Sequence, residues 1–188
     1  MALRGRDIVS IRDLSTEEIT EILDHARKMI PMAEGKKSSD ALAGRVVATA
    51  FFEPSTRTRL SFEAAVQRLG GRCLTIADIG VTSMRKGESL YDTVRMLSSY
   101  SDAIVLRHPN EGAARLAADA SDRPVINAGD GSNQHPTQAL LDLMAMQEAF
   151  GTLSGLKVVL LGDLKYGRTV HSLALALAQF GSEMVLSA

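Results

Sequence analysis

The sequence contains few of the residues that identify a metal-binding, redox or disulfide-stabilised protein. Its 188 residues include one cysteine, no tryptophan and only 4% aromatic residues. One cysteine cannot form an internal disulfide, and no Cys/His cluster has the spacing of a zinc site. The four histidines are scattered over separate segments: His25, His108, His135 and His171. We therefore expect neither a metal site nor a disulfide framework.

The sequence also lacks an excess of charge of either sign and a long hydrophobic run. The formal net charge is −1 and the pI is about 6.4, so no overall basic field attracts nucleic acid. No stretch reaches the length of a membrane span, and the charged segment 1–14 has no apolar core like that of a signal peptide. Cys73 lies in the apolar stretch 73–77, which favours a buried, inert thiol. We expect a cytoplasmic protein without a membrane or nucleic-acid partner.

Short apolar runs alternate with helical patterns along the chain. Residues 15–18, Ser-Thr-Glu-Glu, form a capping-box pattern at the start of an amphipathic helix. Six strand-like runs follow, most of them separated by helical periodicity: 46–52, 73–77, 103–107, 124–127, 157–161 and 184–187. This order predicts the α/β class, with a parallel sheet flanked by helices and ligands bound beyond the carboxyl ends of the strands.

A domain boundary is expected near residues 151–155, where the helical pattern from Thr137 to Phe150 ends and a new strand-helix-strand unit begins. Residues 1–150 then form one domain, and residues 151–188 form the beginning of a second α/β domain. That second part is shorter than the ~40 residues below which a domain usually needs disulfides, metals or partners. We expect the second domain to be incomplete in this chain.

Residues 51–59 place two arginines and three hydroxyl groups where a buried strand turns into a helix, after Pro54 has ended the strand. The four residues at the helix start are Ser55, Thr56, Arg57 and Thr58. At such a position free backbone N–H groups, the helix dipole, hydroxyls and a guanidinium can bind a phosphate together. Ordinary helix capping by serine and threonine is the alternative.

Arg107 ends the third strand-like run, so its side chain is expected at the same edge of the sheet as residues 55–58. There it can bind an anion. A salt bridge to Glu111 or Asp130 is the ordinary alternative.

His135 lies in a glycine-containing loop directly before Pro136, a residue suited to the first position of a helix. The positive end of the helix dipole disfavours imidazolium, so a neutral ring can donate a hydrogen bond to a carbonyl oxygen. Gln138, one turn further, adds a neutral donor or acceptor. A structural role in hydrogen bonding or capping is the alternative for the histidine.

Two further loops contain isolated cations. The segment 82–88 includes Ser83 and Lys86 and has the composition of a mobile loop, where a lysine is most often only solvated. Residues 158–168 resemble the first turn of a nucleotide-binding unit but have neither the dinucleotide spacing nor a P-loop, so we expect no nucleotide cofactor. Arg168, at the start of the next helix, can hold a carboxylate or remain a surface charge.

Together these segments resemble the aspartate/ornithine carbamoyltransferase family and, within it, the catalytic chains of the aspartate branch. The resemblance spans nearly the whole chain and rests on residues 52–63, 83–88, 107–109, 135–138 and 164–168. The Ser-Thr-Arg-Thr segment is similar to that of the whole family. Pro54, the Arg-His-Pro run at 107–109 and residues 164–168 favour the aspartate branch.

The resemblance implies transfer of the carbamoyl group from carbamoyl phosphate to the amine of L-aspartate, giving N-carbamoyl-L-aspartate and phosphate for pyrimidine biosynthesis, with no metal or cofactor. The catalytic residues implied are Arg57, Thr58, Arg107 and His135. Those implied to bind carbamoyl phosphate are Ser55, Thr56, Arg57, Thr58, Arg107, His135 and Gln138. Lys86 and Arg168 are implied to bind aspartate.

The resemblance also implies a homotrimer in which Ser83 and Lys86 reach the site of the neighbouring subunit, and some family members have regulatory chains. Because the second domain is incomplete, we expect this length alone to bind carbamoyl phosphate weakly and to turn over little. Two alternatives stay open. One is an ornithine or related carbamoyltransferase, and the other is a catalytically silent scaffold that binds anions or partner chains.

Overall fold

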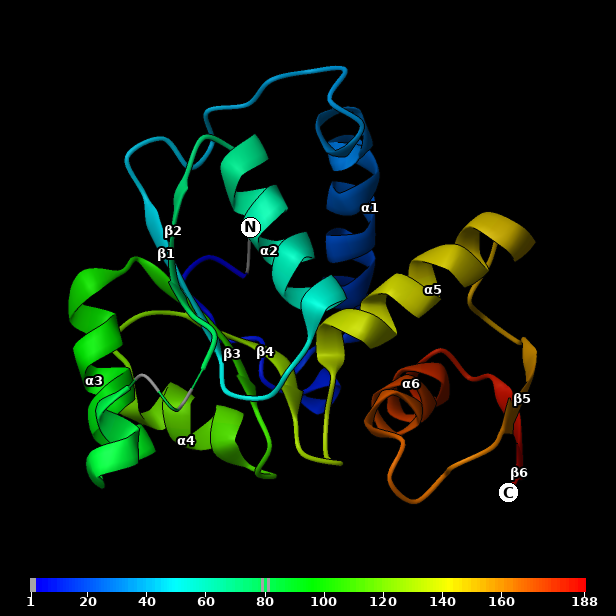
Figure 1. Cartoon of the computed structure of the whole chain (residues 1–188). Helices are drawn as coiled ribbons and strands as arrows, with labels where there is room; N and C mark the ends of the chain where they lie inside the picture. Colours follow the sequence, from blue (N-terminus) through cyan, green and yellow to red (C-terminus); the bar gives the residue numbers. More distant parts are fainter. Residues whose placement is uncertain (1–2, 79, 81) are drawn as a thin grey trace.

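A four-stranded parallel sheet forms the centre of the structure, a computed structural model that describes residues 3–78, 80 and 82–188 (Figure 1). Its order is β2-β1-β3-β4. The strands are β1 (Val46–Phe51), β2 (Arg72–Ile76), β3 (Ala103–His108) and β4 (Val125–Asp130). The predicted α/β class and parallel sheet are therefore confirmed.

Both faces of this sheet are covered by helices, as the apolar character of its central strands requires. On one face, α3 (Leu90–Tyr100) and α4 (Ala113–Ala120) pack against the side chains of Ala48 and Ile104. On the other face, α2 (Thr56–Arg68) packs through Val66 against a second set of β1 and β3 side chains. Side chains alternate between the two faces along each strand, so each strand contributes to both clusters.

A second, smaller unit follows the sheet and packs, through a third hydrophobic cluster, against helices that flank the sheet. Its strands β5 (Lys157–Leu161) and β6 (Glu183–Ser187) form a two-stranded parallel sheet with α6 (Arg168–Gln179) between them in sequence. The cluster joins α6 to α5 (Pro136–Phe150) and to the first helix, α1 (Thr16–Ala33). Its fully buried members include Ile19, Leu143, Ala176 and Leu177. The first helix and the last one thus share one core.

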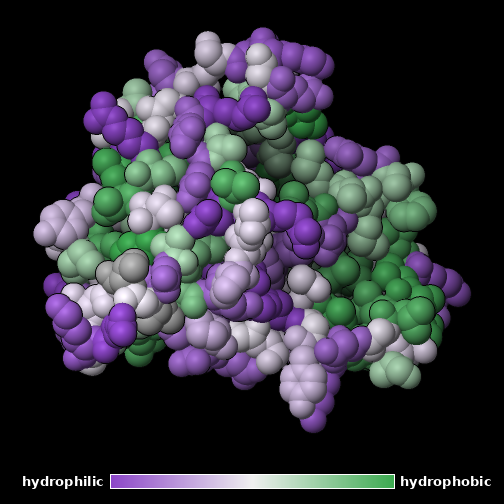
Figure 2. Space-filling view, viewed as in Figure 1, coloured by the Kyte–Doolittle hydropathy of each residue, from purple (hydrophilic) through white to green (hydrophobic). Residues whose placement is uncertain are grey.

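The two-stranded sheet leaves apolar side chains in contact with solvent. Val159, Leu161, Val185 and Leu186 are 64%, 78%, 53% and 61% exposed. Figure 2 shows apolar surface over this part of the molecule. The incompleteness expected for the second domain stays a prediction, and this exposure is consistent with it.

Each predicted strand is present within a few residues of its expected limits, and Ser15 and Glu18 form the predicted capping box at the start of α1. The helix α4 was not named from the sequence, although its buried residues, all alanines, recur at helical spacing: Ala113, Ala114, Ala117 and Ala120. The described residues also form the 3₁₀ helices η1 (Ile11–Asp13) and η3 (Ser83–Lys86).

Cys73 is only half-buried, so the prediction of a buried thiol is only partly met. Burial nevertheless raises the pKa of this thiol, which disfavours the reactive thiolate.

Within the part of the chain that the structure describes, no helix is both long and apolar enough to cross a membrane. The same residues contain no group of three or more His, Cys, Asp or Glu side chains placed to hold a metal ion.

Leu143 tests whether the third cluster stabilises the whole chain. We expect Leu143→Ala to lower the free energy of unfolding by about 2–5 kcal/mol, because it leaves a cavity in a fully buried cluster. Leu141→Ala removes the same atoms from the same helix at a position that is 60% exposed, and should change stability by less than about 0.5 kcal/mol. Denaturant unfolding of both variants measures the difference, and equal effects would contradict the packing described.

Candidate active site

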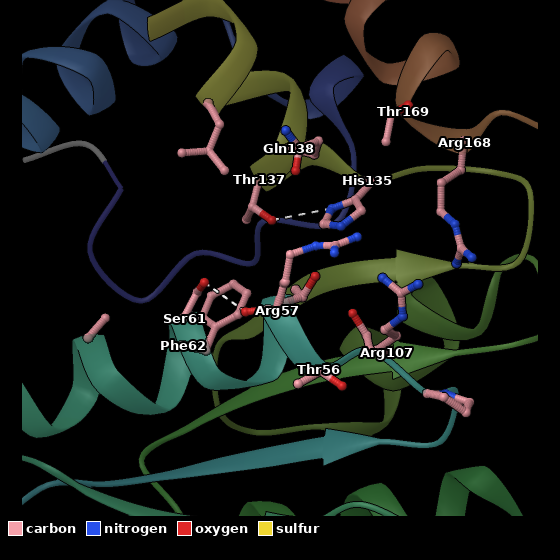
Figure 3. A pocket seen from close by; sticks show the side chains of 15 residues that line it. Thr56, Arg57, Ser61, Phe62, Arg107, His135, Thr137, Gln138, Arg168 and Thr169 are labelled. Carbon is pink, nitrogen blue, oxygen red and sulfur yellow. Dashed lines mark hydrogen bonds between the residues drawn. The ribbon is translucent and has the colours of Figure 1, made fainter. Parts of the chain in front are cut away.

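A cleft of about 800 Å³ opens at the carboxyl ends of the sheet strands, between the main sheet and the smaller unit (Figure 3). Figure 2 shows hydrophilic side chains around the hollow at this place. Eight of the ten predicted site residues line it: Ser55, Thr56, Arg57, Thr58, Arg107, His135, Gln138 and Arg168. Segments more than a hundred residues apart in sequence therefore form one site.

Three helices begin at this cleft. Their N-cap residues are Ser55 for α2, His135 for α5 and Gly167 for α6, and none of the three caps a backbone N–H group of its helix with a side chain. The hydroxyl of Ser55 is thus not used as an ordinary cap, which is the alternative considered for this residue. Unsatisfied N–H groups and the positive helix ends together make the cleft favourable for anions.

Arg57 reaches from the start of α2 across the cleft toward His135 (Figure 3). The side chain is solvent-exposed, and its own carbonyl oxygen accepts a hydrogen bond from the Ser61 hydroxyl at 2.8 Å. Figure 3 shows Arg107 and Arg168 at the other side of the same space. Three guanidinium groups therefore face one cleft.

Glu53 holds two of these arginines together. Arg168 donates two hydrogen bonds to its carboxylate, from Nη1 to Oε2 at 2.9 Å and from Nη2 to Oε1 at 2.5 Å, and Arg107 Nη2 donates to Oε1 at 3.1 Å. The hydrogen bond from Arg168 is the largest cause that lowers the pKa of Glu53 below its ordinary value.

Sequence reasoning offered Glu111 or Asp130 as partners of Arg107, and this was wrong. Asp130 instead accepts hydrogen bonds from Asn127, Asn133 and backbone amides.

Gly129 gives the two arginines the space they occupy. A Cβ atom at this position would lie 3.0 Å from Nη1 of Arg107 and 3.2 Å from Nη1 of Arg168, and the backbone φ of +114° is itself one that other residues rarely adopt. Arg107 Nη1 donates to the carbonyl oxygen of Ala128 at 3.0 Å. The end of β4 therefore positions Arg107 directly.

His135 is buried at the base of the cleft and is held through its backbone. Its N–H donates to Oγ of Ser172 in α6 at 2.8 Å, and its Nδ1 lies 3.4 Å from the Thr137 hydroxyl. Burial, followed by the nearby charges of Arg107 and Arg168, lowers the pKa of His135 to about 4. The prediction that this ring is neutral agrees with these surroundings.

Two predicted residues lie elsewhere in the single chain. Ser83 and Lys86 are exposed in η3 and do not line the cleft. Their action from a neighbouring subunit stays a prediction.

Sequence reasoning assigned no role to Glu53 or Ser172, the residues that fix Arg107, Arg168 and His135. Glu53 lies beside the Ser-Thr-Arg-Thr segment, and an acidic residue close to several arginines indicates an ion pair. Ser172 gives no such signal, because its contact depends on α6 packing against the loop 129–135.

The low pKa of His135 makes stability depend on pH in a defined window. Between the ordinary histidine value of about 6.5 and the folded value of about 4, the unfolded chain binds a proton at this residue that the folded chain does not. Stability should therefore fall as the pH falls through this window, and His135→Gln should remove that part of the decline. Denaturant unfolding at several pH values, with an NMR titration of the ring, tests this. A ring that titrates near 6.5 would contradict it.

Comparison with known proteins agrees with the geometry of this site. Residues 6–148 match the family described as aspartate/ornithine carbamoyltransferase, carbamoyl-P binding domain. The aspartate carbamoyltransferase catalytic subunit of Methanothermobacter thermautotrophicus is 61% identical over 178 residues, which are 95% of this chain and 57% of the relative. The subunit of the same name from Thermococcus kodakarensis is 57% identical, over 99% of this chain and 60% of the relative.

Solved structures give the same result. The catalytic subunit of Methanocaldococcus jannaschii aspartate transcarbamoylase superposes with a TM-score of 0.89 at 55% identity, covering 97% of this chain and 60% of that one. The Trypanosoma cruzi enzyme in complex with carbamoyl phosphate and aspartate superposes with a TM-score of 0.91 at 39% identity, covering 99% and 61%. The chain thus spans 57–61% of the length of these relatives. It belongs to the aspartate/ornithine carbamoyltransferase family.

Proposed function

We propose that this chain contains the carbamoyl phosphate site of an aspartate carbamoyltransferase, which transfers the carbamoyl group to the amine of L-aspartate. In this proposal residues 1–150 are the carbamoyl phosphate-binding domain and residues 151–188 begin the aspartate-binding domain. The observation on which it depends most is the convergence of Arg57, Arg107 and Arg168 on one cleft that also contains His135, a neutral donor. The relatives of 53–61% identity are named as aspartate carbamoyltransferases, which favours aspartate over ornithine as the acceptor.

The phosphate group would bind at the start of α2. The hydroxyls of Ser55, Thr56 and Thr58 and the backbone N–H groups of the first turn can each donate to a phosphate oxygen. Arg57 adds a planar pair of N–H donors and a permanent positive charge, which match two phosphate oxygens. As phosphate leaves with its negative charge, these groups stabilise it without moving.

The carbamoyl carbonyl oxygen would face Arg107, His135 and Thr58. Attack by an amine on this carbon places negative charge on the oxygen, so donors already aimed at it lower the barrier. A neutral imidazole can donate to the oxygen without adding a third permanent charge beside Arg107 and Arg168. Where the Thr137 hydroxyl donates to Nδ1, the ring proton lies on Nε2.

The remaining groups would hold the carbamoyl nitrogen and the acceptor. Gln138, in the first turn of α5, is near enough to the cleft to contact the nitrogen. Arg168, which donates two hydrogen bonds to the carboxylate of Glu53, would also bind a carboxylate of aspartate. A bound substrate carboxylate would therefore compete with Glu53 or share Arg168 with it.

We also propose a homotrimer in which Ser83 and Lys86 act in the cleft of the neighbouring subunit. Both side chains are exposed on η3, while Met84 between them packs against the first hydrophobic cluster and keeps η3 in place. An exposed lysine on η3 supports this proposal because its side chain can extend across a subunit contact. Cytoplasmic location and association with regulatory chains stay predictions.

Arg57 is the most direct test of the phosphate site. We expect Arg57→Ala to weaken carbamoyl phosphate binding by about 10- to 100-fold, since a hydrogen bond to a charged group contributes roughly 1.5–3 kcal/mol. Arg57→Lys should restore little, because an ammonium group does not provide two parallel donors. Arg68→Ala, which removes an exposed arginine from the other end of α2, is the matched control. Calorimetry that finds wild-type affinity in Arg57→Ala would refute the assignment.

The acceptor and the effect of chain length can be tested together. We expect the 188-residue chain to bind carbamoyl phosphate weakly and to turn over little, because it spans about 60% of its relatives' length. When aspartate and ornithine compete in one assay, the carbamoylated product should be carbamoyl aspartate. Preferential carbamoylation of ornithine would reverse the acceptor assignment, and full turnover by this length alone would contradict the predicted need for further residues.

A further inference from the structure

The amide of Gln138 is held in one orientation by a carboxylate outside the cleft. Its Nε2 donates to Oδ1 of Asp142 at 3.0 Å, one helical turn further along α5. Gln138 lines the cleft, whereas Asp142 is half-buried behind it and does not. Among the described residues, this is the one hydrogen bond that the side chain of Asp142 makes.

The chemistry of the pair decides which end of the amide faces the ligand. An ionised carboxylate only accepts hydrogen bonds, and of the two ends of an amide only the NH₂ group donates. The nitrogen of Gln138 therefore lies toward Asp142, and the oxygen lies on the side nearer His135 (Figure 3). Without this contact the amide could rotate by half a turn and present its nitrogen to the cleft.

We propose that Asp142 is a positioning residue that keeps the Gln138 oxygen directed into the cleft, so that the site selects an acyl phosphate whose acyl group has an N–H donor. This inference rests on the proposed function and adds a reason for substrate choice. Carbamoyl phosphate has an NH₂ group where acetyl phosphate has a methyl group. An amide oxygen can accept from the first and is left without a partner by the second.

The two acyl phosphates otherwise make equal use of the site. Their phosphate groups would meet the same donors at the start of α2, and their carbonyl oxygens would meet Arg107 and His135. The difference between them is confined to the group that faces Gln138. A fixed acceptor at this position is therefore sufficient for discrimination.

A simple helix-stabilising role is the competing explanation, because glutamine and aspartate four residues apart often pair on helix surfaces. The environment of Asp142 argues against a purely surface pair. Burial raises the pKa of its carboxyl group, and the hydrogen bond from Gln138 acts in the opposite direction. A carboxylate kept at a partly buried position beside a ligand-facing amide suits positioning better than surface solvation.

The experiment measures dissociation constants of the 188-residue chain for carbamoyl phosphate, acetyl phosphate and inorganic phosphate by calorimetry. The wild type should prefer carbamoyl over acetyl phosphate by about tenfold. Asp142→Ala should reduce this preference to less than about threefold and leave the affinity for inorganic phosphate within about twofold. Glu148→Gln removes the same charge from an exposed position of the same helix and should keep the wild-type preference.

A double-mutant cycle separates positioning from structural damage. Because Asp142 acts through Gln138, Asp142→Ala should have no further effect on the preference in a Gln138→Ala background. If Asp142→Ala does not fold, Asp142→Asn replaces it, since asparagine can present either its oxygen or its nitrogen to Gln138 and should lower the preference in part.

Three results would overturn the inference. An undiminished preference in Asp142→Ala, or in the folded Asp142→Asn, would exclude positioning. An equal loss with and without Gln138 would show that Asp142 does not act through it. A wild-type chain that binds neither acyl phosphate would refute the proposed function as well. Binding with unchanged selectivity in the variant refutes only the role of Asp142.

Discussion

The ion pair between Glu53 and two arginines, Arg107 and Arg168, is the interaction on which the candidate active site depends. Glu53 follows β1, Arg107 lies near the end of β3 and Arg168 begins α6, so one carboxylate joins the main sheet to the smaller unit. Two guanidinium groups this close would repel each other without an anion between them. The carboxylate therefore sets the spacing between the cations that an incoming ligand meets.

Burial and, after it, the same cations lower the pKa of His135. Burial alone disfavours its charged form, and the positive charges of the arginines add to the effect. The site thus combines permanent positive charge with an uncharged imidazole. Ser172 holds the backbone of this histidine from α6, the helix that also presents Arg168, so a displacement of α6 would alter two contacts of the cleft at once.

Local patterns predict most of the fold and many of the site residues. The strands and most helices follow from apolar runs and capping signals, and Arg57, Arg107 and His135 could be placed at one edge because parallel strands end there together. Contacts between distant segments could not be predicted in this way. The true partner of Arg107 lies 54 residues away at Glu53, and several candidates of similar charge were nearer in sequence. The alanine-rich α4 was not named from the sequence, although its buried alanines recur at helical spacing.

The apolar strands of the smaller unit affect how the chain behaves at high concentration. Val159, Leu161, Val185 and Leu186 form an exposed apolar set on a sheet of two strands, whose outer edges leave backbone donors and acceptors open to pairing. Copies of the chain can associate through these edges by adding strands, which withdraws the molecules from solution and becomes faster as concentration rises. Heating would then report the onset of aggregation rather than reversible unfolding, so the stability of this protein is best measured with denaturants in dilute solution.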